Sequence, residues 1–320
     1  MRLPGLVRAV ARAAVLLTAA SALVFAITEL LPGDAADALG GGRISAAQLA
    51  ALRTEQGLDR PAWQRWAVWV WGLLHGDAGR SLLTGRPVAD LVGQRLQATL
   101  VLMTAALAAT VPLILLGCAV VGRRVLRRPG TSPGGLAAGL TAIPQVVVAA
   151  GLAALLSGVL GWVPPVSLLP AGGNPLIEPA ILVLPVLTLA LPSAAFAVAL
   201  LSGAVADALR APHVADARIR GVPTFRILVR QVVPVLAAPA WRVLAAVVGG
   251  LTAGTALVET VFGYAGVGEL LVGSVASRDT PVVQLIGVGS GAAVLALLLV
   301  ADLAAPPHGS VLRWKEAMRS

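Results

Sequence analysis

Residues Leu96–Gly122 read LQATLVLMTAALAATVPLILLGCAVVG, and this stretch contains no charged side chain. A helix that crosses the hydrocarbon core of a bilayer needs about 20 mainly apolar residues, so the stretch predicts a membrane-spanning helix. The whole chain agrees, because 58% of its 320 residues are hydrophobic and only 12% are charged. A soluble domain carries roughly a quarter charged residues. The composition therefore predicts an all-α, polytopic membrane protein.

Further apolar segments of spanning length follow one another along the chain and bring the expected number of transmembrane helices to six. They are Ala13–Leu31, a segment within Gly134–Leu160, about Ala180–Val205, about Pro234–Val258 and Pro281–Ala301. We expect a first segment with one span at 1–31, an extracytoplasmic loop region at 32–95, a core domain with five spans at 96–304 and a tail at 305–320. The first span also resembles a secretory signal, but its apolar run continues past the small residues that could serve as a cleavage site.

Basic residues gather on one side of this predicted topology. They lie near the termini, in a basic turn at Arg123–Arg128 and in the segment Asp207–Gln231, whereas the two short loops on the other side contain Arg278 alone. Cytoplasmic loops are enriched in arginine and lysine. The sequence therefore predicts that both termini and the segment 207–231 lie in the cytoplasm.

The segment 207–231 carries a second pattern, His213-Val214-Ala215-Asp216-Ala217-Arg218-Ile219-Arg220-Gly221. Gly221 can end a helix in the left-handed conformation, and Pro223 then prevents its continuation. Small alanines and several arginines on such a helix favour the docking of a soluble partner, which we expect to be an ATPase. The alternative is an ordinary positively charged cytoplasmic loop.

Several chemistries find no support in the sequence. A phosphate-binding loop needs a Gly-Lys pair, but the only lysine, Lys315, follows Trp314. The three histidines are His75, His213 and His308, and their spacing fits no zinc motif. We therefore predict no catalytic residue, no metal site and no cofactor bound by this chain. The net charge of +9 is concentrated at the ends of apolar runs, which predicts contact with membrane lipid and not with nucleic acid.

Two features allow alternative interpretations. Arg242 lies inside the predicted fifth span; an intramembrane charge indicates a functional role, but a long side chain near a span end can also reach the interface. The cluster Trp63, Trp66, Trp69 and Trp71 predicts an amphipathic helix at the membrane surface, or else a small packed loop domain.

A series of short motifs runs nearly end to end. They are Leu31-Pro32-Gly33-Asp34, Gly57-Leu58-Asp59-Arg60-Pro61, Gly76-Asp77-Ala78-Gly79-Arg80-Ser81, Arg95-Leu96-Gln97-Ala98-Thr99-Leu100, Gly161-Trp162-Val163-Pro164, Glu259-Thr260-Val261-Phe262 with Gly266-Val267-Gly268, and Arg278-Asp279-Thr280-Pro281. Their order and spacing resemble the permease of ABC importers in the dipeptide, oligopeptide and nickel branch. Each motif alone is weak, and the shared order carries the resemblance.

The resemblance implies a type I ABC importer permease fold in the cell (inner) membrane. It implies a translocation path for peptides or a related small solute such as nickel chelates. The implied partners are a second, homologous permease, two ABC ATPase subunits that use the ATP, and an extracytoplasmic substrate-binding protein. The alternative is a secondary transporter or channel that is not coupled to an ATPase.

The resemblance also assigns residues to two sites. The ATPase-coupling loop contains His213, Ala215, Asp216, Ala217, Arg218, Arg220, Gly221, Ile227 and Arg230. The outer-loop family motif contains Glu259, Thr260, Phe262, Gly266, Gly268, Arg278 and Asp279. The sequence departs from the family pattern at Arg220 (usually lysine), Gln231 (usually histidine), Val235 (usually asparagine), Ala215 (often arginine) and Arg242 (usually small or apolar).

Overall fold

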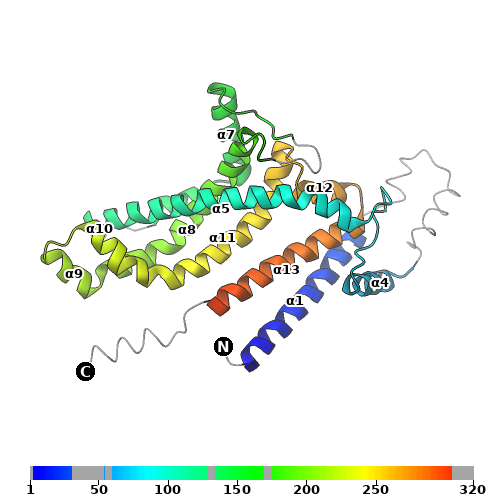
Figure 1. The fold of residues 1–320 in the computed structure, drawn as a ribbon, viewed down its shortest axis with the longest axis horizontal. Coiled ribbons are helices and arrows are strands. Elements are labelled where there is room, and N and C mark those ends of the chain that lie inside the picture. The colour runs from blue at the N-terminus through cyan, green and yellow to red at the C-terminus, as the bar shows by residue number, and fades with distance from the viewer. Residues whose placement is uncertain (1–2, 31–53, 55–59, 128–133, 169–174, 305–320) are drawn as a thin grey trace. The chain divides into compact units, whose positions relative to one another are not determined.

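The computed structural model describes residues 3–30, 54, 60–127, 134–168 and 175–304 (Figure 1). The predicted motifs at 31–34 and 57–59, and the tail at 305–320, lie outside these residues. Within the described part, five helices are long and apolar enough to cross a membrane: α1 (Leu3–Leu30), α5 (Val88–Arg127), α8 (Ala180–Arg210), the helical stretch Phe225–Phe262 and α13 (Thr280–Ala304). The fold there is helical, with a single isolated β-bridge between Arg80 and Pro87.

The predicted third span, within Gly134–Leu160, is present as a bent pair of helices. Gly135–Thr141 (α6) and Gln145–Val159 (α7, Gln145–Leu152, continued by a π-helical turn) enclose an angle of 88°. Pro144 lies at the break. Proline lacks a backbone N–H and restricts the residue before it, so a helix cannot pass through this point unchanged. If the pair counts as one span, the total reaches the predicted six.

The chain divides into two compact units. Unit 1 contains Met1–Thr104, Gly151–Pro185 and Thr252–Leu295. Its elements include α1, α4 (Ala62–Leu74), α12 (Val267–Ala276) and the beginnings of α5 and α13. A small apolar core consists of Ala78, Val88, Val282 and Ile286.

Helix α4 confirms the prediction of a helix in the tryptophan-rich segment. Trp66 Nε1 donates a hydrogen bond of 3.0 Å to Ser21 Oγ on α1, and Arg65 forms an ion pair with Glu29. The two helices therefore lie side by side (Figure 1). Trp63 and Trp71 are exposed on the other side of α4; the location of this helix at the membrane surface stays a prediction.

Unit 2 contains Ala105–Ala150, Val186–Leu251 and Ala296–Ser320. It holds the cytoplasmic ends of the predicted topology, with α9 (Pro212–Ile219), α10 (Thr224–Ile227) and a π-helical turn, η2 (Leu228–Val232), leading into α11 (Val233–Phe262). Its core consists of aliphatic side chains from α5, α8 and these shorter elements, namely Val121, Val125, Val198, Val205, Leu209, Val214, Ala217, Ile227 and Val232.

Two predicted loops are wrong in their extent. The basic turn is not a turn at Arg123, Arg124 and Arg127, because these residues form the last turns of α5. Arginine is a good helix former and interacts favourably with a helix C-terminus. The predicted outer loop 259–280 is also largely helical, since α11 continues to Phe262 and α12 follows. Charge and glycine are weak loop signals, because neither ends a helix by itself.

Candidate functional site

The coupling segment, Asp207–Gln231, begins on the last turn of α8 and continues into α9. Ala211 has an extended backbone at the N-cap of α9, and Pro212 occupies the first helical position, where its missing N–H costs nothing. Val214 and Ala217 are almost fully buried in the core of unit 2. These two residues are three apart and share a helix face, so they hold α9 against α5 and α8.

The end of α9 has the geometry that the sequence predicts. Gly221 has a φ of +73°, which glycine adopts without a Cβ penalty. Its N–H donates to the carbonyl of Arg218 at 3.0 Å, and the N–H of Val222 donates to that of Ala217 at 3.0 Å. This pair of bonds is a Schellman motif. Ala217 and Val222 also pack in the same core, which fixes the direction in which the chain leaves the helix.

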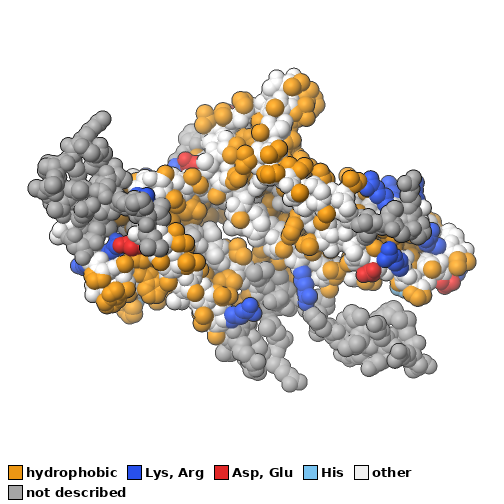
Figure 2. All heavy atoms as spheres, turned by 180° about the vertical axis from the view of Figure 1, so that it is seen from behind, with side chains coloured by type: hydrophobic (Ala, Val, Ile, Leu, Met, Phe, Trp, Pro, Cys, Tyr) orange, Lys and Arg blue, Asp and Glu red, His pale blue; other side chains and the backbone are white. Residues whose placement is uncertain are grey.

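The outer face of α9 is exposed and combines charge with apolar surface. Arg220 forms an ion pair of 2.6 Å with Asp216, one turn earlier on the same helix. Ile219 is 85% exposed and Phe225, just beyond the turn, is 77% exposed. Figure 2 shows basic and hydrophobic side chains intermixed on the surface around α9. Two large apolar side chains beside charges form a surface suited to protein docking.

Most other predicted residues of the coupling segment also lie on this surface. His213, Ala215 and Arg218 are exposed on α9, and Arg230 is exposed on η2. Ile227 differs, because it is buried and anchors α10 in the core of unit 2. Ile219 and Phe225 were missed from the sequence. A signal was available for Ile219, which does not fall on the face of α9 that Val214 and Ala217 define.

The outer-loop motif centres on a buried carboxylate. Glu259 is fully buried at the end of α11. It accepts hydrogen bonds from Thr99 Oγ1 at 2.7 Å, from the N–H of Gly268 at 2.6 Å and from the N–H of Glu269 at 3.1 Å. Thr99 Oγ1 in turn accepts from the N–H of Val267 at 2.8 Å. Glu259 therefore caps the N-terminus of α12, where free N–H groups and the helix dipole favour a negative charge.

The glycines of the motif make this cap possible. A Cβ at Gly266 would lie 2.2 Å from Glu259 Cδ, and a Cβ at Gly268 would lie 2.3 Å from the Cα of Ala256. Any side chain at Gly268 would therefore separate α12 from α11. Tyr264 closes the same turn, because its hydroxyl donates to the carbonyl of Ala98 at 2.7 Å. Burial, and secondarily the nearby Glu259, raises the pKa of Tyr264 and keeps it protonated as a donor.

The remaining motif residues lie apart from this cap. Asp279 accepts from Ser81 Oγ and, at 3.0 Å, from the N–H of Leu82. Arg278 has a φ of 61°, which is unusual for a non-glycine residue. Phe262 is buried, and its carbonyl accepts from the N–H of Ser167 at 2.7 Å. Thr260 is exposed, and its hydroxyl donates to the carbonyl of Ala256 in the same helix at 2.7 Å.

The sequence motifs contain the hydrogen-bond partners of Glu259 and Asp279, but the sequence alone does not pair them. Thr99 lies in the motif Arg95–Leu100 and Ser81 ends the motif Gly76–Ser81. The structure brings each of them to an acidic residue more than a hundred positions away. Thr99 and Glu259 therefore belong to one hydrogen-bonded site, and Ser81 and Asp279 belong to another.

Arg242 lies in the middle of the helical stretch Phe225–Phe262 and its side chain is exposed. The helical stretch begins at Phe225, before the start predicted for this span at about Pro234. A functional role for Arg242, and the alternative that its side chain reaches the interface, both stay predictions.

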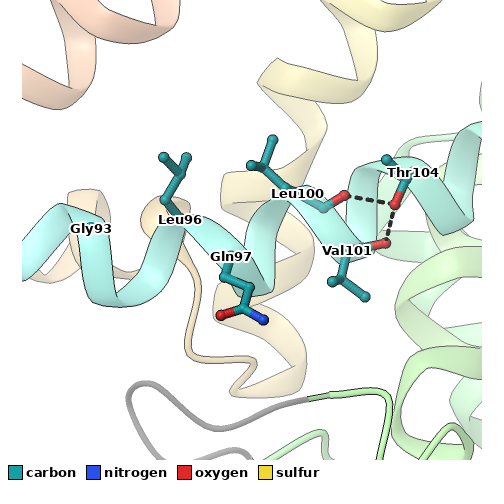
Figure 3. A pocket seen from close by; sticks show the side chains of 6 residues that line it. All are labelled: Gly93, Leu96, Gln97, Leu100, Val101 and Thr104. Carbon is teal, nitrogen blue, oxygen red and sulfur yellow. Dashed lines mark hydrogen bonds between the residues drawn. The ribbon is translucent and has the colours of Figure 1, made fainter.

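A shallow hollow follows one face of α5. It is lined by Gly93, Leu96, Gln97, Leu100, Val101 and Thr104, all from this helix (Figure 3). Thr104 Oγ1 donates to the carbonyls of Leu100 and Val101 at 2.8 and 3.0 Å. Because one helix supplies every lining residue, this is an exposed helix face and not an enclosed site. Within the described residues, no group of three His, Cys, Asp or Glu side chains could hold a metal ion.

Five helices of spanning length, or six with the bent pair, are typical of a multi-pass membrane protein. The family model described as "Binding-protein-dependent transport system inner membrane component" matches residues 81–306, and the model of its N-terminal region matches residues 2–113. The chain belongs to this family. The resemblance inferred from the motifs is thereby confirmed.

Two relatives match most of the chain. A putative peptide transport system permease protein of Brucella abortus is 29% identical over 282 residues, covering 87% of this chain and 89% of the relative. The dipeptide transport system permease protein DppB of Escherichia coli is 29% identical over 293 residues, covering 82% of this chain and 84% of the relative. This chain is therefore a multi-pass permease subunit of an ABC importer that works with an ATPase and a binding protein.

Proposed function

We propose that this permease moves peptides, or a related small solute such as a nickel chelate, and that the coupling segment is where the ATPase docks. The substrate class rests on the relatives, whose names specify peptides and dipeptides. The docking role rests on one observation above all. Ile219 and Phe225 are exposed on either side of the turn at Gly221, while Val214 and Ala217 on the same short helix are buried.

This arrangement lets a push on α9 reach the spans. The buried side chains of α9 and Ile227 pack among Val125 of α5 and Val205 of α8. Closely packed interiors transmit displacement instead of absorbing it. When the ATPases bind ATP and close, α9 moves with them and the attached helices rock as rigid bodies. The Schellman motif at Gly221 keeps the exposed face at a fixed angle to the buried one.

The assembly that follows contains a second, homologous permease, two ATPase subunits and an extracytoplasmic binding protein. Both termini and the coupling segment lie in the cytoplasm, because arginine is concentrated in these parts of the chain and cytoplasmic segments are enriched in it. The outer-loop motif lies on the other side and faces the binding protein. This chain binds no cofactor and carries no catalytic residue, and the partner subunits hydrolyse the ATP.

Affinity purification of the tagged chain from native membranes in mild detergent tests the docking role. Recovery of an ATPase and a second permease is expected for the wild type. Ile219→Ser with Phe225→Ser should lose the ATPase and keep the second permease. Ile177→Ser is the matched control, because Ile177 is 77% exposed but lies outside the coupling segment. A folded wild-type chain that purifies alone would overturn the importer assembly, and full ATPase recovery with the double variant would overturn the docking surface.

A further inference from the structure

Unit 2 contains an open groove that the coupling function does not use. It lies beside the break between α6 and α7 and is lined by residues of α6, α7, α8 and α11, among them Thr141, Gln145, Pro192, Ser193, Phe196 and Gly250. Its volume is about 320 Å³, within the range of small-ligand sites. The lining contains no charged side chain.

The groove lies at mid-depth of the spanning helices that form it. Pro192 and Ser193 are near the centre of α8, which runs from Ala180 to Arg210. Gly250 is likewise well inside the helical stretch Phe225–Phe262. The hydrocarbon core offers no hydrogen bonds, so polar side chains at this depth require partners from protein, water or a ligand.

Two polar side chains in the groove lack such partners in the described part of the chain. Thr141 Oγ1 donates to the carbonyl of Ala138 at 2.7 Å and is satisfied. Gln145 and Ser193 are half-buried, and neither side chain forms a hydrogen bond there. An amide that can donate and accept therefore faces the groove together with a hydroxyl that can do the same.

We propose that Gln145 and Ser193 bind the backbone of a peptide as it passes through the membrane. A peptide bond presents one N–H donor and one C=O acceptor, which a glutamine amide and a serine hydroxyl complement without regard to the peptide's side chains. The uncharged lining suits a path that must accept many sequences and hold none of them tightly. This inference rests on the proposed function, since it assumes that the substrate is a peptide.

The rival interpretation is that the groove is a lipid-filled surface defect. The helix break argues against it, because an irregular backbone at membrane depth is tolerated only where it is buried in protein or lines a water-filled cavity. Ala142, Ile143 and Pro144 form such an irregular stretch beside Gln145, and all three are exposed within this chain. A hydrated, substrate-conducting groove accounts for the break and for the two polar side chains together.

Reconstitution of the complete transporter in proteoliposomes, with binding protein and ATP, tests the assignment. The readout is labelled dipeptide taken up per ATP hydrolysed. Gln145→Leu and Ser193→Ala should each lower this ratio about tenfold if one hydrogen bond to the moving peptide is lost, while ATP hydrolysis stimulated by the binding protein persists. Gln97→Leu, an identical change on the exposed face of α5, should leave the ratio unchanged.

The outcomes separate the two proposals. A wild-type complex that hydrolyses ATP but moves no peptide would overturn the peptide function itself. A wild type that moves dipeptides, together with wild-type ratios for Gln145→Leu and Ser193→Ala, would overturn the groove alone.

Thiol labelling tests access to the groove independently of transport. The chain has a single cysteine, Cys118, so Cys118→Ala gives a background without thiols. In that background Gln145→Cys and Ser193→Cys should react with a charged methanethiosulfonate reagent, and dipeptide with binding protein and ATP should slow the reaction. Leu115→Cys, at an exposed apolar position of α5, should stay unreactive because lipid does not support a thiolate. Groove cysteines that react no faster than this control would overturn the inference.

Discussion

The cap of α12 and the coupling segment are both family motifs, but their side chains are arranged in opposite ways. At the cap, every oxygen of Glu259 is bonded and the side chain is fully buried. On α9, the large side chains Ile219 and Phe225 are exposed and the ion pair between Arg220 and Asp216 lies on the surface. One motif is therefore satisfied by contacts within the chain, whereas the other leaves large apolar and charged side chains exposed.

The largest effect is expected at the cap, from Gly268→Val. The new Cβ would lie 2.3 Å from the Cα of Ala256, and backbone atoms cannot move aside as a flexible side chain can. We expect no folded protein in mild detergent, measured by size-exclusion chromatography and thermal unfolding. Gly273→Val is the matched control, because Gly273 lies in the same helix with nothing within 4 Å of its Cβ position. A monodisperse Gly268→Val protein with wild-type melting would show that α12 does not depend on this close approach.

The second prediction concerns the coupling segment and should change activity more than stability. Gly221→Pro forces φ toward −65° where the native angle is +73°, and it removes the N–H that donates to Arg218. We expect ATP-driven uptake to be abolished and the melting temperature to fall modestly, while the chain still inserts and purifies as a folded protein. Gly221→Asn should retain most uptake, since asparagine tolerates the left-handed region. Wild-type uptake by Gly221→Pro would remove the coupling role of this turn.

The third prediction concerns the buried carboxylate of Glu259, which caps α12. Glu259→Gln removes the charge and presents an NH₂ group to donors that need an acceptor, which costs about 1–3 kcal/mol for a buried unsatisfied group. The melting temperature in detergent should fall clearly. Glu269→Gln is the matched control: Glu269 pairs with Arg95, but its side chain is 39% exposed, so a much smaller shift is expected. Equal shifts for the two variants would contradict the special role of the cap.

The sequence predicted the helical class, the number of spans and the stop at Gly221, because each follows from local chemistry. Apolar length gives a span, and a glycine before Val-Pro gives a helix end. It did not predict that Thr99 pairs with Glu259 or that Ser81 pairs with Asp279, since these contacts join residues far apart in the chain. Nor did it predict the extent of α5 and α11, where arginines and glycines continue a helix that tertiary packing supports.

The smallest effect is expected from the ion pair on α9, and it separates docking from stability. Both side chains are more than 60% exposed, and an exposed i,i+4 pair is worth about 0.3–0.5 kcal/mol at most. Asp216→Asn should therefore leave the melting temperature unchanged. Removing the carboxylate frees Arg220 to reach acidic groups on the ATPase, so co-purification of the ATPase should persist and become more sensitive to salt. If Asp216→Asn instead lowers the melting temperature as much as Glu259→Gln does, then α9 is an internal structural element like the cap, and the contrast between the two motifs fails.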